Sequence, residues 1–178
     1  MNDTSLYRYH YCLFCKASSE HSVAGAIATM FPQSKAKILY QDKWKVVKGV
    51  RSLEHRKMLP GYVFVCSPSE LSVERIDLLS DVLRVLGQEN EGYLLDGDDL
   101  KFSRWVFECK GFVGASMGHS EGKGFVVTSG PLKALTNNIE KVDKHTQTAK
   151  VNIFFDARVM SLWLPFEWDD GAENRQVI

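Results

Sequence analysis

Five glycines between positions 111 and 124 separate two stretches of this chain that have different hydrophobic patterns. Before them, apolar segments at helical spacing alternate with strand-like runs; after them come only short strand-like runs divided by turn residues. The 178 residues are enough for two small domains. The pattern predicts an α/β domain over residues 5–110, a flexible linker over 111–122, and a small all-β domain over 123–170.

The first stretch combines strands and helices. Strands are predicted at residues 7–15, 37–40, 62–66, 82–86 and 93–95, and a basic hairpin at 44–50 and 52–58 with Gly49 near its turn. Helices are predicted to begin at Ser18, at a capping box over 67–70, and at Asp96. Pro32 should end the first of them. This order predicts an α+β or α/β sandwich, an antiparallel-rich sheet flanked by helices.

The second stretch reads as strands alone. Short apolar runs cover residues 125–128, 139–142, 149–155 and 159–164, with turn residues between them. About five short strands in so few residues are typical of a small SH3-like barrel. The polar tail after Trp168 is expected to fray.

Charge is balanced overall but unevenly distributed. Residues 35–57 contain eight lysines and arginines against two acidic residues, whereas residues 70–99 contain nine acidic residues against two arginines. Such a bipolar domain can bind a polyanion on one side and present an acidic side to another partner. The alternative is that both runs are simply solvated faces.

Motifs for catalysis or metal binding are weak. Cys12 and Cys15 form a CxxC, but in a strand their side chains point to opposite faces, and no second CxxC completes a zinc site. The segment 118–123 is one residue short of a phosphate-binding loop, and Gly124 stands where the Ser or Thr is required. We therefore expect no enzyme, no metal and no cofactor.

The cellular location is inferred from two sequence patterns that are not found in the chain. No apolar run reaches the ~20 residues that cross a bilayer, and the first residues do not have the pattern of a secretory signal. We expect a cytoplasmic monomer that is not bound to a membrane.

Four segments resemble landmarks of one protein family. They are residues 56–65 (RKMLPGYVFV), 82–87 (VLRVLG), 124–133 (GFVVTSGPLK) and 164–168 (LPFEW). In this order they are similar to the NusG family of transcription elongation factors, in which an NGN domain precedes a KOW barrel. The resemblance spans nearly the whole chain.

The resemblance implies a binding protein that catalyses no reaction. In the family, the NGN domain holds the clamp helices of the largest RNA polymerase subunit and favours processive elongation. The implied polymerase-binding residues are Leu59, Tyr62, Phe64, Val82 and Leu83. Strand alternation places Val63 and Val65 in the core. The same argument leaves open that Phe64 and Val82 are core residues too.

The chain resembles specialised paralogs, above all the LoaP type, more than the housekeeping factor. The resemblance lies in the run 129–133, the short insert before Pro60 and the ending 164–168. Such paralogs act on particular operons, and the LoaP type is thought to bind a structured leader RNA. Candidate RNA-binding residues are Lys35, Lys37, Lys43, Trp44, Lys45, Lys48, Arg51, His55, Arg56 and Lys57. DNA at the transcription bubble is a second possible contact. A general NusG-type factor and a translation-linked KOW protein remain the alternatives.

The family also implies partners for the second domain: Rho, ribosomal protein S10 or RNA. The sequence does not choose among them. A refolding of this domain into helices, as in RfaH, is not expected, because Val151, Ile153 and Phe155 alternate as in a strand and Gly130-Pro131 would interrupt a helix.

Overall fold

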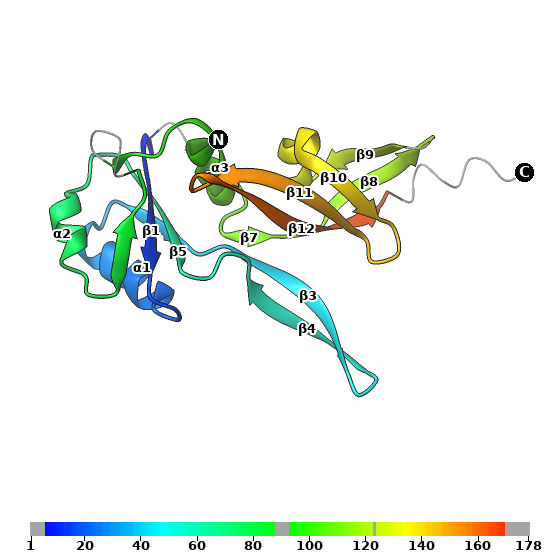
Figure 1. The fold of residues 1–178 in the computed structure, drawn as a ribbon, viewed down its shortest axis with the longest axis horizontal. Helices are drawn as coiled ribbons and strands as arrows, with labels where there is room; N and C mark the ends of the chain where they lie inside the picture. The colour runs from blue at the N-terminus through cyan, green and yellow to red at the C-terminus, as the bar shows by residue number, and fades with distance from the viewer. Residues whose placement is uncertain (1–5, 88–92, 123, 170–178) are drawn as a thin grey trace, which may run out of the picture. The chain divides into compact units, whose positions relative to one another are not determined.

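The computed structural model describes residues 6–87, 93–122 and 124–169, with the backbone alone at 44–47 and 50–53. The chain divides into two compact units, Met1–Phe112 and Val113–Ile178 (Figure 1). The division falls inside the stretch predicted as a linker.

The centre of the first unit is a four-stranded antiparallel sheet. Its strand order is β2-β5-β1-β6. The strands are β1 (Tyr9–Cys15), β2 (Lys35–Lys37), β5 (Tyr62–Ser67) and β6 (Val82–Val85). Three helices accompany them: α1 (Glu20–Met30), α2 (Val73–Asp77) and α3 (Gly97–Glu108). The predicted mixture of an antiparallel-rich sheet and helices is confirmed.

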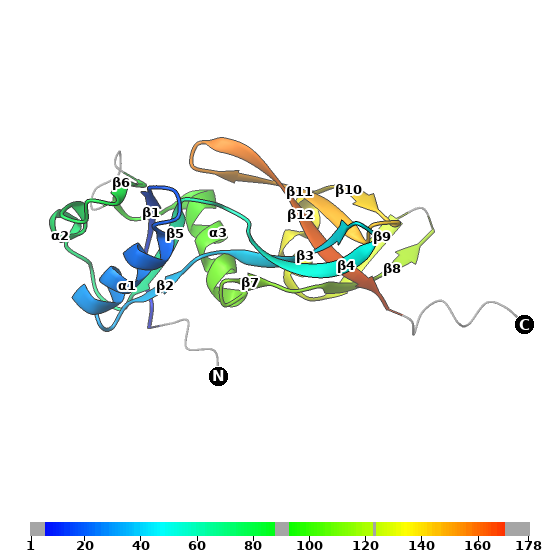
Figure 2. The ribbon, with the colours of Figure 1, turned by 90° about the horizontal axis from the view of Figure 1, so that it is seen from below.

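Both faces of this sheet are covered. Val63 and Val65 of β5 belong to one buried cluster with Val23 and Ile27 of α1. Phe64 points the other way and meets Phe102 of α3 edge-on, with ring centroids 5.7 Å apart. Every residue of β5 is therefore buried, and α1 and α3 lie on different sides of the sheet (Figures 1 and 2).

Cysteine and histidine side chains serve this packing. Cys12 is paired with Phe64 in the register and therefore points to the same face as Phe64. Cys15 belongs to the buried cluster on the other face, under α1. The prediction that the two thiols point to opposite faces is confirmed. Burial raises the pKa of the Cys66 thiol to about 11 and that of Cys109 to about 12. Buried His10 bonds through Nδ1 to Ser103 Oγ of α3 at 2.9 Å, and burial lowers its pKa. Both directions are those that burial in an interior produces, because burial disfavours the charged form of each group.

The hairpin is longer than predicted. Its strands are β3 (Tyr40–Val47) and β4 (Val50–Lys57), with Val47 opposite Val50. The two loop residues, Lys48 (φ 51°) and Gly49 (φ 80°), both have positive φ, the conformation of a type I′ turn. With β7 (Phe112–Val113) the hairpin forms a three-stranded sheet of order β4-β3-β7.

Three local predictions were wrong. Helix α2 begins at Val73 rather than after the capping box, because Ser72 is the residue whose Oγ accepts a bond from the N–H of Arg75. Residues 93–95 form no strand; the N–H of Leu95 instead donates to His10 O. The strand predicted at 37–40 lies at 35–37.

The second unit is a five-stranded sheet of order β10-β11-β12-β8-β9. Its strands are β8 (Ser116–Glu121), β9 (Gly124–Ser129), β10 (Ile139–Asp143), β11 (Thr148–Phe155) and β12 (Arg158–Trp168), with a 3₁₀ segment at Pro131–Asn138. The four strands predicted for this stretch are confirmed, and its core holds Leu132, Val151, Phe155, Leu164 and Phe166.

The predicted linker over 111–122 is wrong for its larger part. Strand β8 pairs in parallel with β12 and antiparallel with β9. Gly118 lies under the Phe125 ring, which a Cβ at this position would approach within 2.6 Å. This glycine provides close packing rather than flexibility.

Candidate protein- and nucleic-acid-binding surfaces

The turn before β5 has a defined geometry. The N–H of Tyr62 donates to Leu59 O at 3.3 Å, with Pro60 and Gly61 between them. Gly61 has φ +86°, so the turn has the features of type II, with proline at its second position and glycine at its third. A Cβ on Gly61 would approach Phe14 Cε2 within 2.9 Å.

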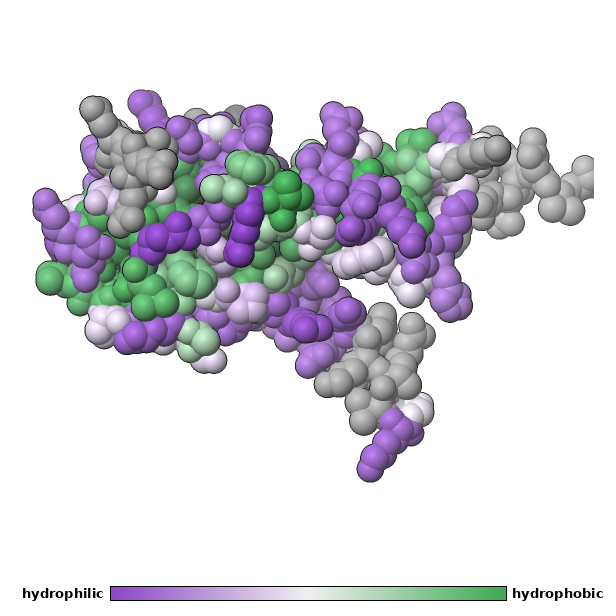
Figure 3. Space-filling model, in the orientation of Figure 1, coloured by the Kyte–Doolittle hydropathy of each residue, from purple (hydrophilic) through white to green (hydrophobic). Residues whose placement is uncertain are grey.

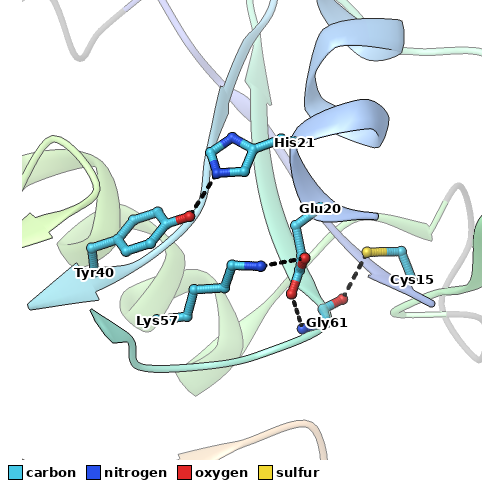
Figure 4. A network of polar contacts seen from close by, with 6 residues as sticks. All are labelled: Cys15, Glu20, His21, Tyr40, Lys57 and Gly61. Atoms are coloured by element: carbon cyan, nitrogen blue, oxygen red, sulfur yellow. Dashed lines mark hydrogen bonds and ion pairs between the residues drawn. The ribbon is translucent and has the colours of Figure 1, made fainter. Parts of the chain in front are cut away.

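A buried carboxylate at the start of α1 fixes this turn (Figure 4). Glu20, at the start of α1, is 1% exposed. Its Oε1 accepts from the N–H of Gly61 at 2.8 Å, and its Oε2 accepts from Lys57 Nζ at 2.7 Å. Burial acts to raise the pKa of the Glu20 carboxyl, but the bonds from Lys57 and Gly61 outweigh it and hold this pKa below its usual value. Cys15 adds a bond from Sγ to Gly61 O at 3.3 Å.

Most of the expected polymerase contacts are interior residues. Leu59 is 7% exposed, Tyr62 4% and Phe64 0%. Tyr62 packs on Phe14 with ring centroids 5.0 Å apart. The expectation that Leu59 and Tyr62 present their side chains at the surface is therefore not met, because the side of the sheet that carries Tyr62 and Phe64 is covered as well.

Strand β6 offers more accessible apolar surface. Leu83 is 57% exposed and Val82 is partly buried. The register pairs Arg84 with Phe14, which is itself only partly buried. Figure 3 shows hydrophobic surface gathered at the end of the first unit where α2 and β6 lie. Phe14 was missed from sequence, since nothing local distinguishes it from the buried aromatic residues of β1.

The basic residues of 35–57 do not form one patch. Lys43 and Arg56 are exposed on one face of the hairpin, since the register pairs Gln41 with Arg56 and Lys43 with Glu54. Lys48 is exposed in the turn. Lys35 and Lys37 lie instead on β2, at the edge of the other sheet. The side chains of Trp44, Lys45 and Arg51 lie outside the described residues.

Of the candidates whose side chains are described, Lys57 and His55 are bonded to carboxylates, and Lys35 lies over the Tyr7 ring at 4.0 Å. The bond to Glu20 raises the pKa of Lys57 and makes this lysine part of the fold. His55 Nδ1 bonds to Asp42 at 2.9 Å. Lys57 is therefore a poor candidate for RNA binding.

Four rings form a stack at the root of the hairpin. Tyr40 and His55 are 4.6 Å apart between centroids and 11° from parallel, and His55 and Phe112 are 5.5 Å apart at 11°. His21 of α1 follows at 6.1 Å from Tyr40 and bonds to its hydroxyl at 2.7 Å (Figure 4). We call His21, Tyr40, His55 and Phe112 the aromatic ladder.

A solved structure has a similar architecture. The structure described as "Domain interaction in Thermotoga maritima NusG" matches over 88% of this chain and 93% of the other, with a TM-score of 0.51 and 17% sequence identity. The chain has a NusG-like fold. No family model and no curated protein matches the sequence. The NusG-like fold covers both units, which is the extent of the resemblance seen in the sequence.

The described residues of this NusG-like chain were also compared with the requirements of a metal site and of a membrane-spanning helix. No three His, Cys, Asp or Glu side chains gather into a group that could hold a metal ion. No helix of the described segments has the length and apolar character to span a bilayer.

Proposed function

We propose that this protein is a transcription elongation factor that binds RNA polymerase through its first unit, at the clamp helices of the largest subunit. The observation that carries the proposal is the NusG-like fold over 88% of the chain. The segment 56–65 supports it independently, because its sequence resembles the NGN-domain signature of the NusG family.

The action requires no bond to be made or broken. A factor that binds the processive state of polymerase more tightly than the paused state shifts the population by the difference of the two affinities. An exposed apolar residue available for such docking is Leu83. Val82 instead packs against the buried cluster under α1, and Phe14 points to the other face of the sheet. Leu59, Tyr62 and Phe64 are buried and would act through the fold of the first unit.

The finer proposal is antitermination at specific operons through a leader RNA, as the LoaP-type resemblance implies. Exposed Lys43, Lys48 and Arg56 on the hairpin support it, since phosphates are met by flexible cations on an accessible element. A general elongation or termination factor is the alternative. A translation-linked RNA-binding protein is a more distant one.

The second unit is proposed to recruit a further partner, Rho, ribosomal protein S10 or RNA. Its hairpin of β11 and β12 exposes Phe154 (50%), Val159 (67%) and Trp163 (41%). Phe154 and Val159 are paired in the register and so point to the same face. This apolar face favours a protein partner over RNA.

Leu83→Asp is expected to weaken binding of core RNA polymerase about tenfold or more, the effect of losing a central apolar contact. Leu83 is exposed, so the fold should survive. Affinity for immobilised polymerase, measured beside a circular dichroism melt, checks both points. Val159→Asp in the second unit makes the same chemical change at an exposed residue and should leave affinity unchanged. Equal binding by wild type and Leu83→Asp would exclude β6 as the docking surface.

A further inference from the structure

A pocket opens beside the aromatic ladder. Its volume is about 320 Å³, near the lower end of the size of small-ligand sites. All four ladder rings line it, and the remaining lining residues include Ala24, Ala36 and Gly111, whose small size leaves the space open. The whole pocket belongs to the first unit.

The aromatic ladder offers a ligand both an apolar ring and a ring nitrogen. Phe112, at one end of the ladder, is 39% exposed although it is a large apolar ring. Because His55 Nδ1 is bonded to Asp42, the Nε2 of this ring is the atom left for a ligand. Stacked rings with accessible ring nitrogens are the means by which proteins hold unpaired bases.

Cations complete the lining. Lys37, half-buried on β2, and Lys110, exposed after α3, both line the pocket. Neither forms an ion pair with a carboxylate of the described residues. The acidic residues nearby are matched: Asp42 bonds to His55, and Glu20, which precedes His21, bonds to Lys57. The pocket therefore favours an anion.

We propose that this pocket binds one unpaired nucleotide of a single strand, with its base stacked on the aromatic ladder and its phosphate held by Lys37 and Lys110. The proposal rests on the nucleic-acid-binding part of the proposed function. It assigns the contact with a base to the root of the hairpin instead of its tip. Contacts at the hairpin tip would supply general phosphate attraction, whereas the ladder at the hairpin root would hold a base. His55 then acts as one ring of the ladder.

Anisotropy titration of the full chain with 5′-fluorescein oligouridylate RNA of about ten nucleotides tests the stacking contact. Phe112→Leu keeps an apolar side chain but removes the ring, and should weaken binding about fivefold or more. Phe31→Leu is the matched control at a partly buried phenylalanine outside the pocket and should bind as wild type does. If wild type fails to bind, or if Phe112→Leu binds within about twofold of it, the proposal is overturned.

The phosphate contact has its own signature. The double variant Lys37→Gln/Lys110→Gln should lower the slope of log affinity against log salt by about 0.7, the loss of one single-strand phosphate contact. Lys16→Gln/Lys101→Gln removes the same charge at exposed lysines outside the pocket and should leave the slope unchanged. Equal changes in the two pairs would contradict a localised phosphate site.

A second probe, the matching oligothymidylate DNA, identifies the strand. Tighter binding of RNA assigns the pocket to RNA, and equal affinity assigns it to either single strand. Cross-linking of 4-thiouridine RNA should label peptides that contain Tyr40, His55 or Phe112; labelling confined to the hairpin tip would overturn the proposal. Polymerase affinity of Phe112→Leu is measured in parallel and should not change, so that failure of the pocket and failure of the polymerase proposal are distinguishable.

Discussion

Glu20→Ala should destabilise the first unit by about 3–5 kcal/mol, the range for breaking a buried ion pair by removing one partner. The Glu20 side chain is 1% exposed and Lys57 only 27%, so solvent compensates little for the loss. The N–H of Gly61 would lose its acceptor as well. Because this N–H lies in the turn before β5, the substitution should also loosen the segment 59–62.

Amide hydrogen exchange of β1 and β5 measures this loss in the first unit separately from the second. Glu20→Gln is the control: it keeps an oxygen that can accept from Gly61 but removes the charge beside Lys57. Its expected loss is smaller, about 1–3 kcal/mol. A change below about 1 kcal/mol in Glu20→Ala would show that the network does not hold the turn.

The same carboxylate makes a prediction about acid. The folded-state pKa of Glu20 is lowered, so its contribution to stability is full above the unfolded value of about 4.3. This contribution is lost as the pH falls through the lower folded-state pKa. Glu20→Gln should therefore flatten the loss of stability of the first unit in this acid range, in the same exchange experiment.

Gly130→Ala should destabilise the second unit by about 2–5 kcal/mol, from backbone strain together with overpacking. Gly130 has φ 89° and ψ −175°, a region that is essentially restricted to glycine. A Cβ there would lie 2.6 Å from the Cα of Ser116. Backbone cannot rotate away as a side chain can. Ser116 is itself fixed, since it is fully buried and its Oγ accepts from the N–H of Leu132 at 2.9 Å.

Gly122→Ala is the control that separates backbone strain from the steric clash of an added Cβ. Gly122 has φ +57° but nothing within 4 Å of its added Cβ, so only the left-handed backbone penalty of about 1–2 kcal/mol applies. Exchange of the β8 and β12 amides reports both variants. If Gly130→Ala costs no more than Gly122→Ala, close packing of β8 against this turn is not what requires the glycine.

The sequence predicted elements with strong periodicity and missed features that depend on distant contacts. Helix α1 and the strands from β9 to β12 were predictable because their apolar spacing is regular. The segment 111–122 was not, because a glycine that allows a ring to approach looks the same in sequence as one that loosens a linker. Gly118 differs from a linker glycine only through Phe125.

The candidate site shows the same limit. Lys57 belongs to a basic run, and only its bond to Glu20, 37 residues away, makes it part of the fold. Tyr62 was expected to contact polymerase because of the family resemblance, and alternation places it on the side of the strand opposite to Val63. Alternation says which side a residue faces and cannot say whether that side is covered. The aromatic ladder joins four segments, and no spacing rule connects His21 to Phe112.

Single-round transcription with purified RNA polymerase and a template that carries an intrinsic terminator tests the central claim most directly. The proposed elongation factor should increase read-through or the rate of elongation, and more strongly with a cognate leader upstream if RNA recruits it. Leu83→Asp should abolish the effect and Val159→Asp should not abolish it. Unchanged elongation and termination with and without the wild-type protein, together with no binding to polymerase, would contradict the account.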